Sequence, residues 1–242
     1  MEPAPQGMAY ALFVHGLDIT LEDEATYRVA ADAYQQALAP LGVQLLPVAT
    51  NIRQFIRNWE YSHGSALCGT AMITRRAIRR FLVPSSKTYT TLEPWGSDPL
   101  VDPLLSSDGF DVVHDGAAFS RFDKLHAMRE WPVIRPLLRT CYAHPDGLAN
   151  CGRCANCLRT MLVLAALGVL DQFPTFPGVP SPRVFAGTSW QTPHERLFGR
   201  QAVEYAAWRG ASELARVGKT ALARSRREAV FREVGRRLKW KR

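Results

Sequence analysis

The sequence predicts an α/β protein with a parallel sheet, followed by a four-cysteine zinc loop and a basic helical tail. Three observations support this prediction. Short apolar runs alternate with helical patterns over the first two thirds of the chain, which is typical of parallel α/β sheets. Four cysteines lie close together in residues 141–157. Lys and Arg are concentrated after residue 199.

The first two thirds of the chain contain four predicted strands separated by helical patterns. The apolar runs predict strands at 10–14, 43–48, 81–83 and 110–113. The helical spacing predicts helices at 23–39, 51–59, 65–80 and 120–128, and the third of these leads directly into the third strand. Pro40 and Gly42 end the first helix, and Asn51 is a plausible N-cap for the second.

The remainder of the chain is predicted to be mostly helical. Residues 135–142 are expected to run extended into the cysteine loop, and 158–170 to form an apolar helix leaving it. Residues 171–191 are rich in Pro and Gly and predict a linker. We therefore expect an α/β domain over 1–170 that includes the zinc loop 141–157, a linker over 171–191, and a basic helical tail over 192–242.

Length and composition limit the class of protein. A chain of 242 residues with 47% apolar residues can form one substantial core, and this composition excludes a disordered chain. No stretch approaches the roughly 18 apolar residues needed to span a bilayer. The first residues lack a basic region and a cleavage site for secretion, so a cytoplasmic location is expected.

The positive charge belongs to the C-terminal part of the chain. From Arg200 onward there are 13 Lys and Arg against 4 Asp and Glu, so this part has a net charge of +9. The first 199 residues together carry about −1, which gives the total of +8. Such a tail could bind RNA, an acidic membrane surface or an acidic protein. The alternative is a solvated helix that packs its apolar stripe on the domain.

The cysteine spacing is the most specific chemical signal in the sequence. Cys141, Cys151, Cys154 and Cys157 supply the four thiolates that a tetrahedral zinc ion requires, and Gly152 eases the tight turn between them. Four protein ligands leave no open position, so the predicted site is structural.

Disulfides or a redox pair are the alternatives to zinc. A secreted scaffold would contain more cysteines, and a redox pair would not require four of them together. His144 could replace one cysteine as a ligand, although its place before Pro145 suggests a turn. Cys68 lies in an apolar run and is expected to be a buried small residue.

Polar clusters follow three of the predicted strands. Asp18 follows the first strand, Ser85 and Ser86 follow the third, and Asp115 follows the fourth. Ligands of open parallel sheets bind at the carboxyl ends of the strands, so these residues are candidates for a nucleotide or substrate pocket. Taken singly, the HG and DG dipeptides beside them are also ordinary turn chemistry.

Two further features could belong to the same pocket. Arg121 and Lys124 lie in the first turn of a predicted helix, where an anion such as phosphate is favoured. A solvated basic face is an equally good interpretation of this pair. The stretch 93–99 (EPWGSDP) could form a substrate-facing loop, or a loop held in place by Trp95 as an apolar plug.

Several motifs together resemble 7-cyano-7-deazaguanine synthase and its relatives, which are PP-loop ATP pyrophosphatases. The resemblance covers residues 9–170 and rests on the cysteine loop followed by Leu158 and Arg159, on Arg121 and Lys124, and on the segments HGLD, HGSAL, PSSKTY, PWGSDPLVDPL and VHDG. It implies a Rossmann-like (HUP-type) sheet. It also implies an enzyme that uses ATP and Mg²⁺ to adenylate a small-molecule substrate, with release of pyrophosphate, before a nitrogen nucleophile attacks.

The sequence departs from this family at the phosphate-binding loop. Family members hold the ATP phosphates with an SGGxDS loop after their first strand, and this sequence contains no such motif. The expected explanations are a sequence that starts late, a loop supplied by another chain, or lost ATP chemistry. A sheet without its first strand would expose an edge, which favours a homo-oligomer. The alternative function is a non-catalytic zinc-stabilised module that binds RNA or a protein through the tail.

Overall fold

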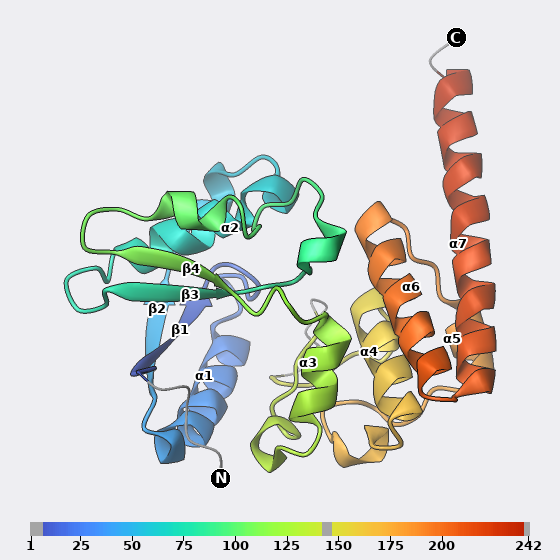
Figure 1. The fold of residues 1–242 in the computed structure, drawn as a ribbon, viewed down its shortest axis with the longest axis horizontal. Coiled ribbons are helices and arrows are strands. Elements are labelled where there is room, and N and C mark those ends of the chain that lie inside the picture. The colour runs from blue at the N-terminus through green and yellow to red at the C-terminus, as the bar shows by residue number, and fades with distance from the viewer. Residues whose placement is uncertain (1–6, 142–146, 240–242) are drawn as a thin grey trace. The chain divides into compact units, whose positions relative to one another are not determined.

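The computed structural model describes residues 7–141 and 147–239 and divides the chain into two compact units. The first unit, Met1–Ala127, contains the strands, and the second unit, Met128–Arg242, is helical (Figure 1). The chain is therefore a mixed helix and strand protein with parallel strand pairs, as the sequence predicts. No helix in the described part of the chain is both long enough and apolar enough to cross a membrane.

The described residues of the first unit form four strands and three α-helices. The strands are β1 (Tyr10–His15), β2 (Gln44–Ala49), β3 (Arg80–Pro84) and β4 (Asp111–Asp115), and the helices are α1 (Glu24–Leu38), α2 (Trp59–Met72) and α3 (Arg121–Met128). All four predicted strands are confirmed, with ends that differ by a few residues. β1 pairs with β2 and β3 pairs with β4, both in parallel. The described residues thus form two sheets of two strands each.

The outer edge of each two-stranded sheet is closed by groups of this chain. On β2, the Leu45 N–H donates to Gln35 Oε1 at 3.0 Å, and Pro47 has no N–H to offer. On β4, the Val112 N–H donates to Ser106 Oγ at 2.9 Å. These contacts block the addition of another strand on either outer edge.

The opposite edges of β1 and β3 are open. The ladder register directs the backbone groups of residues 10, 12 and 14 away from β2, and those of residues 80, 82 and 84 away from β4. Within the described part of the chain, these groups have no hydrogen-bond partner in another strand. The first unit therefore has two open parallel edges, although Leu12 of β1 packs against the buried cluster of β3 and β4.

Helix α2 lies earlier in the chain than the sequence pattern predicts. The expected helix over 65–80 is wrong in its bounds, because α2 spans Trp59–Met72 and turns separate it from β3. At its end, Thr74 Oγ1 donates to the Ala71 carbonyl at 2.6 Å, which satisfies a carbonyl that a continuing helix would have used. Cys68 of this helix is buried in the core, as predicted.

The second unit is built from four α-helices. They are α4 (Ala155–Ala166), α5 (Pro182–Gly187), α6 (Pro193–Trp208) and α7 (Ser212–Lys239). Gly210 separates α6 from α7 and has a φ of 77°, a conformation that glycine adopts without strain. Helix α4 packs on α6, where the Arg159 guanidinium lies 4.8 Å from the centre of the Phe198 ring. Residues 128–170 thus belong to the same unit as the tail, whereas the sequence analysis placed a boundary at residue 170.

The segment expected to be a linker is packed into the second unit. Its aromatic side chains, Phe173, Phe176, Phe185 and Trp190, are all buried. Pro and Gly residues favour turns, and in this segment they lie between buried aromatic residues. The proline-rich composition therefore reflects irregular backbone with its own core contacts.

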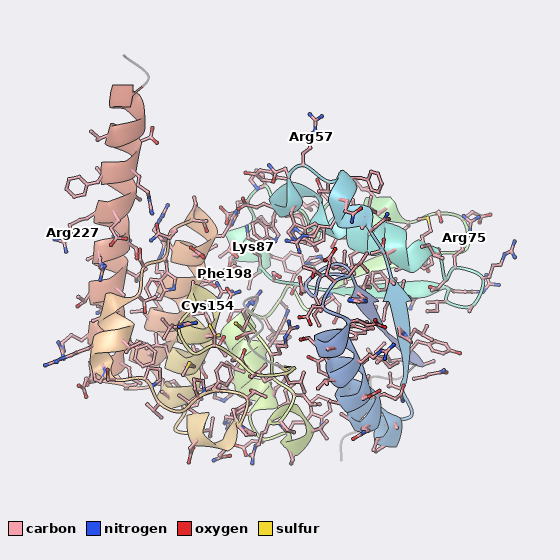
Figure 2. All side chains as sticks on the ribbon, turned by 180° about the vertical axis from the view of Figure 1, so that it is seen from behind. Arg57, Arg75, Lys87, Cys154, Phe198 and Arg227 are labelled. Atoms are coloured by element: carbon pink, nitrogen blue, oxygen red, sulfur yellow. The ribbon has the colours of Figure 1, made fainter. Side chains whose placement is uncertain are left out.

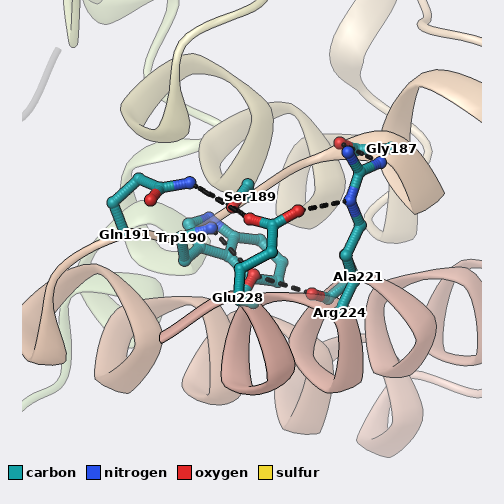
Figure 3. Close-up of polar contacts among 8 residues, drawn as sticks. Gly187, Ser189, Trp190, Gln191, Ala221, Arg224 and Glu228 are labelled. Carbon is teal, nitrogen blue, oxygen red and sulfur yellow. Dashed lines mark hydrogen bonds and ion pairs between the residues drawn. The ribbon is translucent and has the colours of Figure 1, made fainter. Parts of the chain in front are cut away.

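A polar network fastens residues 187–191 to the middle of α7 (Figure 3). Glu228 accepts hydrogen bonds from Ser189 Oγ and from Arg224 Nε, the latter at 2.8 Å. Arg224 also donates to the Gly187 carbonyl at 3.2 Å. One turn away, the Trp190 N–H donates to Ser225 Oγ at 2.9 Å. These bonds hold α7 in place up to about residue 228.

We predict that Glu228 makes the stability of the second unit sensitive to acid. The hydrogen bonds from Ser189 and then Arg224 lower the pKa of Glu228 from 4.5 to about 2. A carboxyl whose folded-state pKa is lowered stabilises the fold above its unfolded pKa and loses this contribution as pH falls through the folded pKa. The E228Q variant should therefore be less stable than the wild type at neutral pH, and the difference should shrink from pH 4.5 to about 2.

Chemical unfolding followed by circular dichroism at several pH values measures this difference. Glu204 is exposed on α6 and offers a matched control. The E204Q variant is expected to follow the wild type across the same pH range. A gap between E228Q and wild type that stays constant with pH would contradict the proposed role of the carboxylate.

Candidate metal centre and strand-end site

The four predicted cysteine ligands converge on one point in the second unit. Their Sγ atoms all lie within 4.8 Å of one another. The separations are 3.4 Å for Cys154 and Cys157, and 3.9 Å for both the Cys151–Cys157 and the Cys141–Cys154 pairs. Sulfurs bound to one tetrahedral zinc ion at about 2.3 Å would be about 3.8 Å apart. The cluster is therefore compatible with a metal ion such as zinc.

The sulfur separations also bear on the disulfide interpretation. A disulfide joins sulfurs about 2.05 Å apart, whereas all five cysteines in this structure are free thiols. Cys68 is part of the first unit and lies outside the cluster. His144, considered as an alternative ligand, lies outside the described residues.

Backbone geometry shapes the loop around the sulfurs. The Cys154 N–H donates to Cys151 Sγ at 3.4 Å, and the Cys157 N–H donates to Cys154 Sγ at 3.5 Å. Cys154 is the N-cap of α4, so the positive end of the helix dipole faces its sulfur. Gly152 has a φ of 69°, and a Cβ there would lie 2.3 Å from Pro177 Cγ. Only glycine fits at this position.

Asn150 connects the two ends of the cysteine loop. Its Oδ1 accepts from the N–H of Cys141 at 3.1 Å and from the N–H of Thr140 at 2.9 Å. Its Nδ2 donates to the Leu138 carbonyl at 2.8 Å. The side chain is buried and its oxygen lies 3.9 Å from Cys157 Sγ. Asn150 therefore positions Cys141, which is distant in sequence from the other three cysteines.

The hydrogen bond between Cys154 and Cys157 shifts the pKa values of the two thiols in opposite directions. The pKa of Cys154 is lowered to about 5, chiefly by this bond. The pKa of Cys157 is raised, chiefly by the same bond and further by burial of the thiol. Metal ions bind thiolates, so a bound cation would favour the charged form at all four positions.

A second candidate site lies where β3 and β4 end in the first unit. Lys124 Nζ donates to the carbonyl and the hydroxyl of Ser85, at 2.9 and 2.5 Å. Arg121 Nη2 lies 3.4 Å from Ser86 Oγ. The structure thus brings together four of the six residues predicted for the nucleotide or substrate pocket, with two cations beside two hydroxyls.

Asp115 and Asp18 are the other two residues predicted for this pocket. Asp115 accepts the Ser85 N–H through its backbone carbonyl at 2.8 Å, and its charge raises the pKa of Lys124. Burial has the larger effect and lowers the pKa of Lys124 overall, and Arg121 adds to this lowering. Asp18 is exposed in the loop after β1.

The 93–99 loop docks on the start of α2. The Gly64 N–H donates to the Gly96 carbonyl at 2.8 Å, and a Cβ on Gly64 would lie 2.0 Å from that oxygen. The Trp95 ring lies against the ammonium of Lys87, which is 4.4 Å from the ring centre. Lys87 is buried and also forms an ion pair with Glu93 at 2.7 Å. These contacts fit the interpretation of Trp95 as a plug.

Sequence reasoning missed a buried polar centre next to this loop. Asp102 has no exposed surface, and its Oδ2 accepts from His114 Nδ1 and from Ser97 Oγ, both at 2.7 Å. His114 Nε2 is buried and has no hydrogen-bond partner among the described residues. The one available signal was the alternation of β4, which turns His114 to the same face as the buried Val112.

Comparison with known proteins adds no assignment to these two sites. No protein-family model matches the chain, and neither the curated proteins nor the solved structures gave a match.

We predict that the purified chain carries one zinc ion, which is released together with four titratable thiols. Substituting serine for any cysteine of the cluster should lower the zinc content and the unfolding temperature, because zinc prefers four soft ligands and its binding energy contributes to folding. Elemental analysis with a colorimetric zinc and thiol titration measures both quantities. C68A is the matched control and should retain the zinc ion.

We also predict that Asn150 contributes to metal affinity without touching the metal. The N150A variant removes the bonds that hold Cys141, and losing such an outer contact typically weakens metal binding by about 10- to 100-fold. Competition with a chelator of known affinity measures this change. Asn156, on the first turn of α4, provides the control N156A. Equal zinc affinity in N150A and wild type would contradict the positioning role.

Proposed function

We propose that this chain is a zinc-binding, PP-loop-type protein related to enzymes that adenylate a substrate with ATP. The proposal combines the motif resemblance with the two candidate sites. The cysteine cluster would hold a structural zinc ion in the second unit. The ends of β3 and β4 would bind nucleotide phosphate in the first unit.

The observation that carries this proposal is the grouping of Ser85, Ser86, Arg121 and Lys124. These residues come from the end of β3 and from the first turn of α3, and hydrogen bonds join them. Two cations beside hydroxyl groups and a helix N-terminus form the arrangement that phosphate oxygens favour. Gly116, with a φ of 77°, allows Lys124 to approach the chain closely, because a Cβ there would lie 3.0 Å from its Nζ.

The roles of these residues follow from their environment. Burial makes the ammonium of Lys124 costly, so a bound phosphate would stabilise its charge and Arg121 would share the contact. Bound Mg·ATP would supply the adenylyl group and the pyrophosphate leaving group. The chain itself would orient the phosphates through Arg121, Lys124 and the two serine hydroxyls. No nucleophile or general base is assigned among the described residues.

The open edges of β1 and β3 are consistent with a further strand between them, which the proposed fold requires. Among the described residues, β1 and β3 each have one edge that pairs with no strand, whereas side chains bond to the outer edges of β2 and β4. One additional parallel strand could pair with both open edges and join the two sheets into a single HUP-type sheet of five strands. Such a strand, contributed by another polypeptide segment, is where an SGGxDS loop would enter the site.

The zinc ion would have no part in the chemistry. All four ligands of the cluster are protein thiols, so no position is open for water or substrate. Its proposed role is to hold the loop before α4, whose side chains form the most buried part of the second unit.

We predict that Mg·ATP binds at the strand ends and that K124M weakens this binding by about tenfold, the loss expected for one buried charge-assisted contact. Isothermal titration calorimetry measures the affinity, and a coupled assay detects pyrophosphate. Lys219, exposed on α7 in the second unit, provides the control K219M. The absence of ATP binding, or equal affinity in K124M and wild type, would refute the proposed site.

A further inference from the structure

The last part of α7 extends beyond the positions that are buried in the second unit. Helix α7 packs on α5 and α6, and the last of its described buried positions is Ser225. Glu228 and Arg232 still bond residues 189–191, and the C-terminal end of the helix continues past the end of α6 (Figure 1). We call residues 226–239 the distal segment of α7, and its side chains are described up to residue 234.

The distal segment carries an exposed apolar stripe. Val230, Phe231 and Val234 are 62%, 75% and 49% exposed. At about 100° per residue, these three positions fall within one third of the helix circumference. The same arithmetic puts the stripe on the side opposite the buried Ala221 and Ser225, so the stripe faces away from the second unit.

The distal segment is basic, and two exposed arginines lie beside the stripe. The distal segment contains six Lys and Arg against two Glu, a balance of +4. Arg226 and Arg227 are exposed at the start of the stripe, and Arg227 points away from α6 on the outer side of α7 (Figure 2). Closer to the body of the unit, the same face of the helix continues with Arg216, Lys219 and Thr220 around an open groove.

These features decide between three kinds of partner. A second copy of the chain would bring like charges together around the stripe, which is unfavourable. RNA would use the arginines and could stack on Phe231, but it would gain nothing from Val230 and Val234. An anionic bilayer uses both parts, because its headgroups attract the arginines and its acyl boundary accepts apolar side chains.

We propose that the distal segment of α7 is a docking surface for anionic phospholipid bilayers. The helix would lie in the plane of the interface with Val230, Phe231 and Val234 inserted and the arginines at the phosphates. The network around Glu228 fixes the base of this segment, so binding would tether the second unit to the surface. The proposal is independent of nucleotide binding in the first unit.

Flotation of the full chain with vesicles tests this proposal. We expect binding to vesicles of phosphatidylcholine with phosphatidylglycerol, and at least tenfold weaker binding to phosphatidylcholine alone or at high salt. Two double variants separate the contributions, F231S/V234S for the apolar contacts and R226E/R227E for the charges. Each should lower the partition coefficient by about tenfold or more. The F231W variant should show blue-shifted emission on binding.

The matched control removes two exposed apolar residues elsewhere. Phe55 and Val179 are 76% and 64% exposed, so F55S/V179S should bind vesicles like the wild type. Thermal unfolding checks that all variants fold, which is expected because the substituted side chains are exposed. Three results would overturn the proposal: no binding to anionic vesicles, F231S/V234S binding equal to that of the control, or tight RNA binding that F231S/V234S retains while vesicles compete poorly.

Discussion

The convergence of four cysteine sulfurs is the constraint on which the second unit depends. The described residues of the loop before α4 have little regular structure, so their backbone conformation relies on Asn150, on Gly152 and on any metal ion that the four sulfurs bind. The loop ends at Cys154, which caps α4 and so fixes where that helix starts. Helix α4 is almost completely buried and packs on α6, which in turn packs on α7. A displacement at the sulfurs would therefore be transmitted through three helices.

The structure of the first unit depends on which strand edges have hydrogen-bond partners. A pair of parallel strands is a small sheet, and parallel sheets are normally extended and covered on both faces. Within the described residues, side chains of Gln35 and Ser106 bond to the outer edges, whereas no strand pairs with the other edges of β1 and β3. A further strand that pairs with these edges would account for the difference, and the proposed nucleotide site requires the same arrangement.

The parts of the structure that were predicted are those with a local cause. Apolar runs flanked by Gly, Pro and Asp predicted all four strands, and cysteine spacing predicted the cluster because CxxC steps curl a short chain around one point. The errors and omissions have causes distant in sequence. Helix α2 starts earlier than predicted, and Gly64 near its start bonds to Gly96, which is 32 residues away in the sequence. The bond between Asn150 and Cys141 likewise forms only in the folded loop. The Asp102 and His114 pair joins a turn to a strand, which no spacing rule detects.

Helix α7 is packed against its neighbours over its first half and exposed over its distal segment. Over its first half, α7 buries small residues such as Ala221 and Ser225 against its neighbours, so packing stabilises the helix. None of the described residues of the distal segment is buried, and isolated helices shorter than about 12 to 15 residues are marginal in water. A surface that buries Val230, Phe231 and Val234 would offset this cost. Docking of the distal segment on an anionic surface would therefore order the same helix that makes the contact.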